Sequence, residues 1–386
     1  MADILAEDQP SLGRARSADL VAVKRPEAGG RLLQLDALRA FAILAVLYEH
    51  WSGGFRDWLP IGGGTLGVDL FFTLSGFLIT GILLQDIAER GDAPGRVIRG
   101  FYIRRFSRLA PAFYSVLLIL ALLGIGGIAS SWPWHVTYLS NFYMAMGGTV
   151  SVLWTLSVEE QFYLLWPMVL LVTPRRWLVG VGIAMIAMSA VSKLIALAFG
   201  YWLSFYLLPW QLDCLGAGCL LAILSFRNGK RNQFEWFTKK RSAVFAAAAV
   251  VAISLAVIDW YIHRGGMTRF FFVNPLCAVF MAWLTLMSAR GWTGFMGRIF
   301  DSPILQYIGR ISYGIYLVHN WMPDIVEKIF GPLPKYQATP IVVGLTFGVC
   351  ALSWRFFEQP LIRAGRQLAD AWDARRGDAV TDQAGA

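Results

Sequence analysis

Long apolar stretches of roughly 18 or more residues recur along the chain, and each is long enough to cross about 30 Å of hydrocarbon as a helix. They are continuously apolar rather than alternating, which excludes membrane strands. The pattern therefore predicts an all-α, polytopic membrane protein with about ten transmembrane helices. The expected spans are 34–52, 66–86, 106–128, 157–173, 177–198, 204–226, 242–260, 270–288, 312–330 and 339–358.

The basic residues fit this arrangement if both termini are cytoplasmic. Most Lys and Arg residues then lie in cytoplasmic segments, as membrane topology favours. The exceptions are Arg56, Arg264, Arg269, Lys328 and Lys335 outside, with Lys193 in a helix. The net charge of +9 is explained by topology, and because the bases are divided among short loops we expect no nucleic-acid partner.

Composition supports the same class, with 56% hydrophobic and only 15% charged residues. We expect a disordered cytoplasmic tail over 1–31, a transmembrane domain over 32–362 and a cytoplasmic C-terminal tail over 363–386. The four cysteines fall in apolar segments without metal-ligand spacing, so we expect them to serve packing and expect no metal site.

Three ionisable residues interrupt the first apolar stretch: Asp36, Arg39 and His50. Arg39 and His50 are eleven positions apart, which places them within roughly 20° of one helix face and about 16 Å apart along the axis. Ionisable groups at membrane depth usually face a cavity or a partner. A histidine there suits proton abstraction from a hydroxyl. The alternative is a structural Asp36–Arg39 ion pair with an interfacial histidine.

A second group of candidates is the adjacent pair Glu159 and Glu160, near the start of the fourth span and on the outer side with His50. Either carboxylate could orient the histidine or bind substrate. The alternative is a solvated helix N-terminus, where acids complement the helix dipole.

On the cytoplasmic side, Arg105 and Arg108 share a helix face at spacing i, i+3, and arginine forks suit phosphate oxygens such as those of CoA. The alternative is a topological role alone. Arg104 and Arg105 cannot both face the same cavity.

Polar residues also mark the second and ninth spans. Asp69 opens the second, and Ser75 with Gly76 lies at membrane depth, where the pair suits close helix packing or a channel lining. No nucleophile-elbow motif surrounds Ser75, which argues against a nucleophile. Tyr313, Tyr316 and His319 form a polar stripe, either packed by hydrogen bonds or lining a substrate path.

Taken together, these segments resemble the membrane-bound acyltransferase family 3, which includes polysaccharide O-acetyltransferases. The resemblance covers about 36 to 360. It rests on Leu35–Arg39 with His50, Gly67–Asp69 with Leu74–Phe77, Arg105–Arg108, Trp154–Tyr163, Ile311–His319 and Phe357–Pro360. Thr73 and Thr155 depart from the usual Phe and Ser. Many relatives carry a further hydrolase-like domain, whereas we expect a stand-alone membrane unit here.

The resemblance implies catalysis by His50 with Glu159 or Glu160. It implies CoA binding by Arg39, Arg105, Arg108 and Ser75, and substrate lining by Asp36, Asp69, Tyr313, Tyr316 and His319. The donor would be acetyl-CoA or another acyl-CoA, with no tightly bound cofactor. The acceptor would be a hydroxyl of a cell-surface or exopolysaccharide sugar or of a lipid-linked saccharide. The protein would be located in a bacterial inner membrane. Membrane lipid and polysaccharide-synthesis proteins are the other expected partners.

Two other functions fit the same residues. One is O-acylation of a small molecule such as a macrolide, and the other is a glycan or lipid transporter that uses the polar stripe as a pathway. A transporter needs no CoA site, so CoA binding that depends on Arg105 and Arg108 distinguishes it from an acyltransferase.

Overall fold

The computed structural model describes residues 31–51, 63–90, 93–149, 152–200, 205–227, 251, 254 and 274–384. Within those ranges the regular structure is helical and no strand occurs, which confirms the all-α prediction. The first half contains α1 (Arg31–Trp51), α2 (Gly63–Arg90), α3 (Pro94–Leu123), α4 (Ile128–Val136), α5 (Ser140–Ala145), α6 (Leu153–Val172), α7 (Leu178–Phe199) and α8 (Leu212–Arg227).

The second half contains α10 (Asn274–Arg290), α11 (Gly294–Phe300), α12 (Pro303–Val318), α13 (Met322–Phe330), α14 (Lys335–Ser353) and α15 (Gln359–Ala384). Short 3-10 turns, η2 (Arg175–Trp177) and η4 (Leu208–Gln211), precede α7 and α8. A π-helical turn, η6 (Trp354–Glu358), joins α14 to α15, so that the two form one long helical stretch.

Five stretches in the described part of the chain are long and apolar enough to cross a membrane. They are Gly64–Glu89, Pro94–Leu123, Arg175–Phe199, Leu208–Phe226 and Lys335–Trp372. The molecule is therefore a helical membrane protein, whereas the count of ten spans and the cytoplasmic termini remain predictions. The expected span 242–260 and the expected tail over residues 1–30 lie outside the described residues.

Two predicted boundaries are wrong. Helix α3 begins at Pro94 rather than near 106, because its charged first half lowers the apolar signal without weakening the helix. The expected span 312–330 is two helices, α12 and α13, separated at His319–Trp321. Pro323 explains this break, since its ring would clash with the carbonyl of His319 and it has no N–H to donate in a continuous helix.

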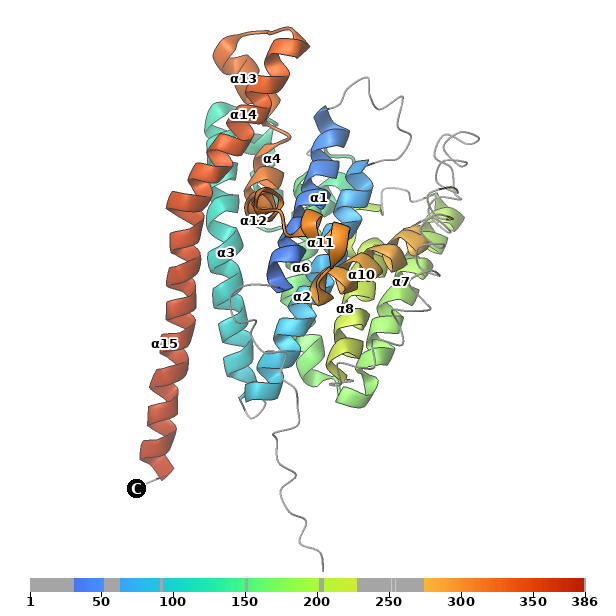
Figure 1. Cartoon of the computed structure of the whole chain (residues 1–386), viewed down its shortest axis with the longest axis vertical. Helices are drawn as coiled ribbons and strands as arrows, with labels where there is room; N and C mark the ends of the chain where they lie inside the picture. The colour runs from blue at the N-terminus through green and yellow to red at the C-terminus, as the bar shows by residue number, and fades with distance from the viewer. Residues whose placement is uncertain are drawn as a thin grey trace, which may run out of the picture.

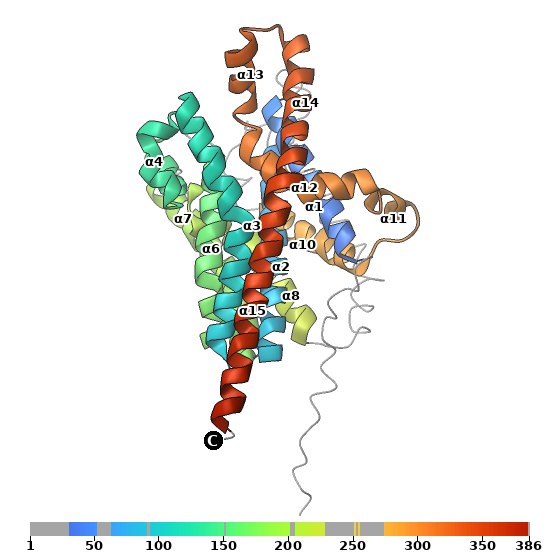
Figure 2. The same cartoon turned by 90° about the vertical axis from the view of Figure 1, so that its left-hand side faces the viewer.

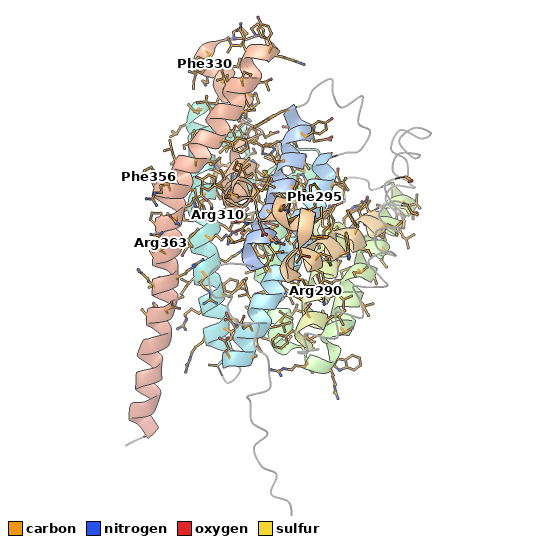
Figure 3. All side chains as sticks on the ribbon, viewed as in Figure 1. Arg290, Phe295, Arg310, Phe330, Phe356 and Arg363 are labelled. Atoms are coloured by element: carbon orange, nitrogen blue, oxygen red, sulfur yellow. The ribbon has the colours of Figure 1, made fainter. Side chains whose placement is uncertain are left out.

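Helices α3 and α15 run along the long axis of the molecule, whereas α10 crosses it obliquely (Figure 1). Helices α13 and α14 form a hairpin at one end, and α15 runs to the opposite end beside α3, as Figure 2 also shows. Figure 3 places Phe356 and Arg363 on the α14–α15 stretch at the edge of the bundle, and Phe356 is 74% exposed. An exposed aromatic side chain on such a stretch suits contact with lipid.

Helices α2 and α8 pack closely, and α2 supplies part of the cavity described below. A Cβ atom on Gly76 would lie 2.2 Å from the backbone oxygen of Leu215, and one on Gly218 would lie 2.1 Å from the backbone oxygen of Thr73. Small residues allow helix backbones to approach in this way inside membranes. The close packing expected at Ser75–Gly76 is confirmed.

Gly76→Ala should destabilise the protein by about 1–3 kcal/mol, because the added methyl group meets the backbone of α8, which cannot move aside. Gly81→Ala is the matched control, since a Cβ at that position of the same helix has no neighbour within 4 Å. Thermal unfolding of the purified protein in detergent compares the two. Equal unfolding midpoints would contradict the close contact.

Candidate functional site

A polar cavity lies between α1, α2, α3, α6 and α12. Its volume is about 80 Å³, which is room for several water molecules. The lining residues are Arg39, Val68, Phe71, Phe72, Ser75, Arg105, Arg108, Leu109, Thr155, Leu156, Glu159, Tyr163, Ser312, Tyr313 and Tyr316. Apolar walls thus surround a small number of charged and hydroxyl groups, as in ligand-binding pockets.

Three arginines, Arg39, Arg105 and Arg108, give the cavity its positive charge. Arg39 Nη1 lies 3.0 Å from Asp36 Oδ1, so the ion pair considered from the sequence exists, and Arg39 lines the cavity as well. The Arg105 guanidinium stands 3.8 Å from the centre of the Tyr163 ring, a cation–π contact. Glu159 is the one carboxylate among the lining residues, so cation exceeds anion and the cavity suits an anionic ligand.

A chain of hydrogen bonds links α2 to α6 in the cavity wall. The Tyr163 hydroxyl donates to Ser75 Oγ at 2.9 Å, and Ser75 Oγ donates to Glu159 Oε1 at 2.6 Å. The short second bond is typical of a hydroxyl on a carboxylate. Ser75 therefore fixes the position of the Glu159 carboxylate beside the arginines.

Helix α12 forms another wall through Tyr313 and Tyr316. The Tyr313 hydroxyl donates to the Leu109 carbonyl at 3.0 Å, and the Tyr316 hydroxyl lies 2.6 Å from Thr155 Oγ1. Thr155 Oγ1 in turn donates to the Val152 carbonyl. The predicted tyrosine stripe is thus both hydrogen-bonded and cavity-lining, so the two interpretations left open by the sequence are compatible.

His50 and His319 lie together beyond this wall, at the end of α1 and just after α12. Their ring centroids are 5.0 Å apart with the planes at 84°. His319 is fully buried, whereas His50 is exposed on its other side. Neither lines the cavity, although Tyr316 touches both regions through a ring contact with His319 at 5.4 Å.

Residues 32–358 match the family model described as "Acyltransferase domain". The chain belongs to this acyltransferase family. It is 28% identical over 366 residues to a peptidoglycan O-acetyltransferase of Listeria monocytogenes, and 29% identical over 366 residues to a putative peptidoglycan O-acetyltransferase of Bacillus subtilis. A putative O-acetyltransferase of Staphylococcus aureus is 28% identical over 367 residues.

Each of these matches covers 86% of this chain. The chain spans little more than half of the relatives' own length, with 56% of the Listeria protein, 57% of the Staphylococcus protein and 55% of the Bacillus protein matched. No solved structure matches the acyltransferase.

The structure corrects the expected separation of Arg105 and Arg108 from Glu159. The sequence placed the arginines at the cytoplasmic edge and the carboxylate on the outer side, yet all three line one cavity. Because α3 begins at Pro94, Arg105 lies about three turns inside the helix. Arg104 faces elsewhere and pairs with Asp86 at 2.5 Å, as expected for neighbours that cannot share a face.

Besides His50 and His319, three further predicted residues do not line the cavity. Glu160 is half-buried outside it, and Asp36 contributes through its pair with Arg39. Asp69 is buried on α2, where its backbone carbonyl accepts a bond from Thr73 Oγ1. Asp69 is therefore a buried residue of α2 outside the cavity lining.

The sequence reasoning missed Tyr163, Thr155 and Ser312, which all line the cavity. The signal for two of them was present: residues 155, 159 and 163 are spaced by four, so they share the face of α6 that carries Glu159. Ser312 lies four residues before Tyr316 on α12, so the same spacing places it on the face of the predicted tyrosine stripe.

The described residues contain no group of three or more His, Cys, Asp or Glu residues placed to hold a metal ion. The four cysteines, Cys214, Cys219, Cys277 and Cys350, are free and buried, which agrees with the packing role expected for them.

Ser75→Ala should destabilise the protein by about 1–3 kcal/mol, because it leaves Glu159 and the Tyr163 hydroxyl without their shared partner. Ser192→Ala is the matched control, since among the described residues the Ser192 hydroxyl bonds to a carbonyl of its own helix, that of Ser189. Thermal unfolding in detergent is the measurement. A loss no larger than that of the control would show that the network contributes little.

Proposed function

We propose that the chain is a membrane O-acyltransferase that moves an acyl group, acetyl being the expected one, from acyl-CoA to a hydroxyl of a cell-surface glycan. The observation that carries the proposal is the buried cavity in which Arg39, Arg105 and Arg108 converge, on a scaffold that belongs to an acyltransferase family. Charged groups are costly at membrane depth and are kept where function uses them.

The three arginines supply what the phosphates of an acyl-CoA require. Guanidinium groups bind phosphate oxygens through paired hydrogen bonds, and the apolar walls around them lower the local dielectric constant, which strengthens each contact. CoA has a long, flexible pantetheine arm between its phosphates and its thioester. Arg39 and His50 are eleven residues apart on α1, or about 16 Å along the axis, so phosphates at the arginines and a thioester near His50 would share one molecule.

His50 would then act as the general base. It takes the proton of the acceptor hydroxyl, whose oxygen forms a bond to the thioester carbonyl carbon. The carbon–sulfur bond breaks, and the leaving thiolate recovers the proton from His50. The Ser75–Glu159 pair holds a carboxylate beside the arginines, where it keeps their side chains oriented while the donor is absent.

The names of the relatives favour a polysaccharide acceptor, since two of them are named as peptidoglycan O-acetyltransferases. Peptidoglycan, an exopolysaccharide or its lipid-linked precursor all present sugar hydroxyls. We place the enzyme in the bacterial inner membrane with both termini cytoplasmic, from the distribution of Lys and Arg. Cytoplasmic acyl-CoA would then meet an acceptor delivered at the outer side by polysaccharide-synthesis proteins.

His50→Ala should abolish acetylation of the glycan, because no other base is placed beside the acceptor hydroxyl in this mechanism. Proton NMR of cell-surface polysaccharide from a deletion strain, complemented with wild type or the variant, measures acetyl content. Restoration by wild type alone supports the proposal. Unchanged acetyl content in the deletion strain would point to a small-molecule acceptor, and failure of polysaccharide export itself would point to a transporter.

Arg105→Ala should weaken binding of CoA by about 10-fold or more, since one charge-assisted phosphate contact contributes about 1.5–3 kcal/mol. Arg104→Ala is the matched control: it removes a neighbouring arginine that pairs with Asp86 and does not line the cavity. Calorimetry with CoA and purified protein compares the two. Equal CoA affinities of the two variants would show that the cavity is not the binding site of the donor.

A further inference from the structure

His319 is buried at the break between α12 and α13 with one ring nitrogen already committed. Its Nδ1 lies 2.8 Å from the backbone carbonyl oxygen of Tyr316, and its exposed fraction is 0%. A carbonyl can only accept a hydrogen bond, so Nδ1 carries the proton. The neutral ring therefore has its lone pair on Nε2.

That lone pair has no hydrogen-bond partner among the described residues. A buried polar atom left unpaired costs about 1–3 kcal/mol, and such atoms in folded proteins call for an explanation. In this tautomer, Nε2 of His319 is a buried hydrogen-bond acceptor with no donor among the described residues.

The neighbour that can supply a proton is His50. The two rings meet edge to face with centroids 5.0 Å apart, which places the exposed His50 side chain close enough for a ring N–H to reach Nε2 after a change of rotamer. Hydrogen bonds of catalytic groups are often misaligned before substrate binds and shorten in the complex. Glu159, the partner expected from the sequence, is instead bonded to Ser75 in the cavity.

The break in the helix also connects the two histidines through the backbone. Pro323 has no N–H, so the His319 carbonyl lacks the partner that a continuous helix would give it. The indole N–H of Trp51 donates to this oxygen at 3.1 Å. Trp51 follows His50 on α1. This bond therefore holds the end of α1 against His319, whose ring contacts that of His50.

We propose that His319 is the positioning residue of His50: its Nε2 accepts the N–H of His50 and thereby fixes the His50 tautomer that takes the proton of the acceptor. This inference rests on the function proposed above. Once His50 has gained the proton of the acceptor hydroxyl, the same contact stabilises the imidazolium until the proton passes to the departing thiolate. An orienting group of this kind serves the histidine of other acyl-transfer enzymes, where it is a carboxylate.

His319→Ala should reduce the rate of CoA thiol release from acetyl-CoA about 10- to 100-fold in membrane vesicles of the complemented deletion strain, with little change in KM for acetyl-CoA. His319→Gln should recover much of the rate, because an amide oxygen can accept the His50 N–H. His135→Gln is the matched control. His135 is also buried, bonded to Ser131 and Ser140 away from the site, and burial lowers its pKa to about 4.

A second readout is independent of activity. The chain has four histidines, so ¹⁵N labelling and comparison with His50→Gln identify the His50 signals by NMR. Wild type and His319→Gln should show one neutral tautomer of His50, and His319→Ala should show a mixture. If His319→Ala does not accumulate in the membrane, His319→Phe takes its place, since it fills the space without an acceptor.

An unchanged His50 tautomer in His319→Ala, or a rate no lower than that of His135→Gln, overturns the inference. Failure of the proposed function gives a different result. In that case His50→Ala releases CoA thiol as fast as wild type, while the NMR comparison still reports whether His319 sets the tautomer.

Discussion

Charged groups buried among membrane helices need partners, and the arrangement of the site depends on how this chain supplies them. Asp36 pairs with Arg39, the Tyr163 ring covers the Arg105 guanidinium, and Ser75 bonds to Glu159. Each contact lowers the cost of keeping charge out of water. What remains is a cavity with more cation than anion, which is ready for an anionic ligand.

Close helix packing makes this arrangement possible. Gly76 brings α2 against α8, and the neighbouring Ser75, about 100° around the helix, lines the cavity. A side chain at Gly76 would shift α2 and move Ser75 away from Glu159. Helix packing at Gly76 and the hydrogen bond of Ser75 are therefore coupled, and a substitution at either residue should disturb both interactions.

The contact between His50 and His319 depends on a different feature, the helix break caused by Pro323. Pro323 interrupts the helix at His319, and the carbonyl left without a partner bonds to Trp51. The break thus connects α12 to the end of α1 instead of simply ending a helix. Tyr316 contacts both His319 and the cavity, so the cation-rich region and the histidines lie along one face of α12.

The sequence alone determined that the protein is helical and membrane-embedded, because the length and apolarity of each stretch are local properties. It also identified the charged residues of the cavity, Arg39, Arg105, Arg108 and Glu159, together with Ser75. Helical spacing sufficed for the pairs on one helix, such as Arg105 with Arg108.

Only the tertiary structure decided which helices face each other. Glu159 bonds to Ser75, 84 positions away, and His50 meets His319 rather than a glutamate. Periodicity gives the face of one helix but not the depth or rotation of its neighbour, so the start of α3 at Pro94 was enough to move Arg105 beside Glu159. Contacts between distant segments follow from packing of the whole bundle, which no local pattern encodes.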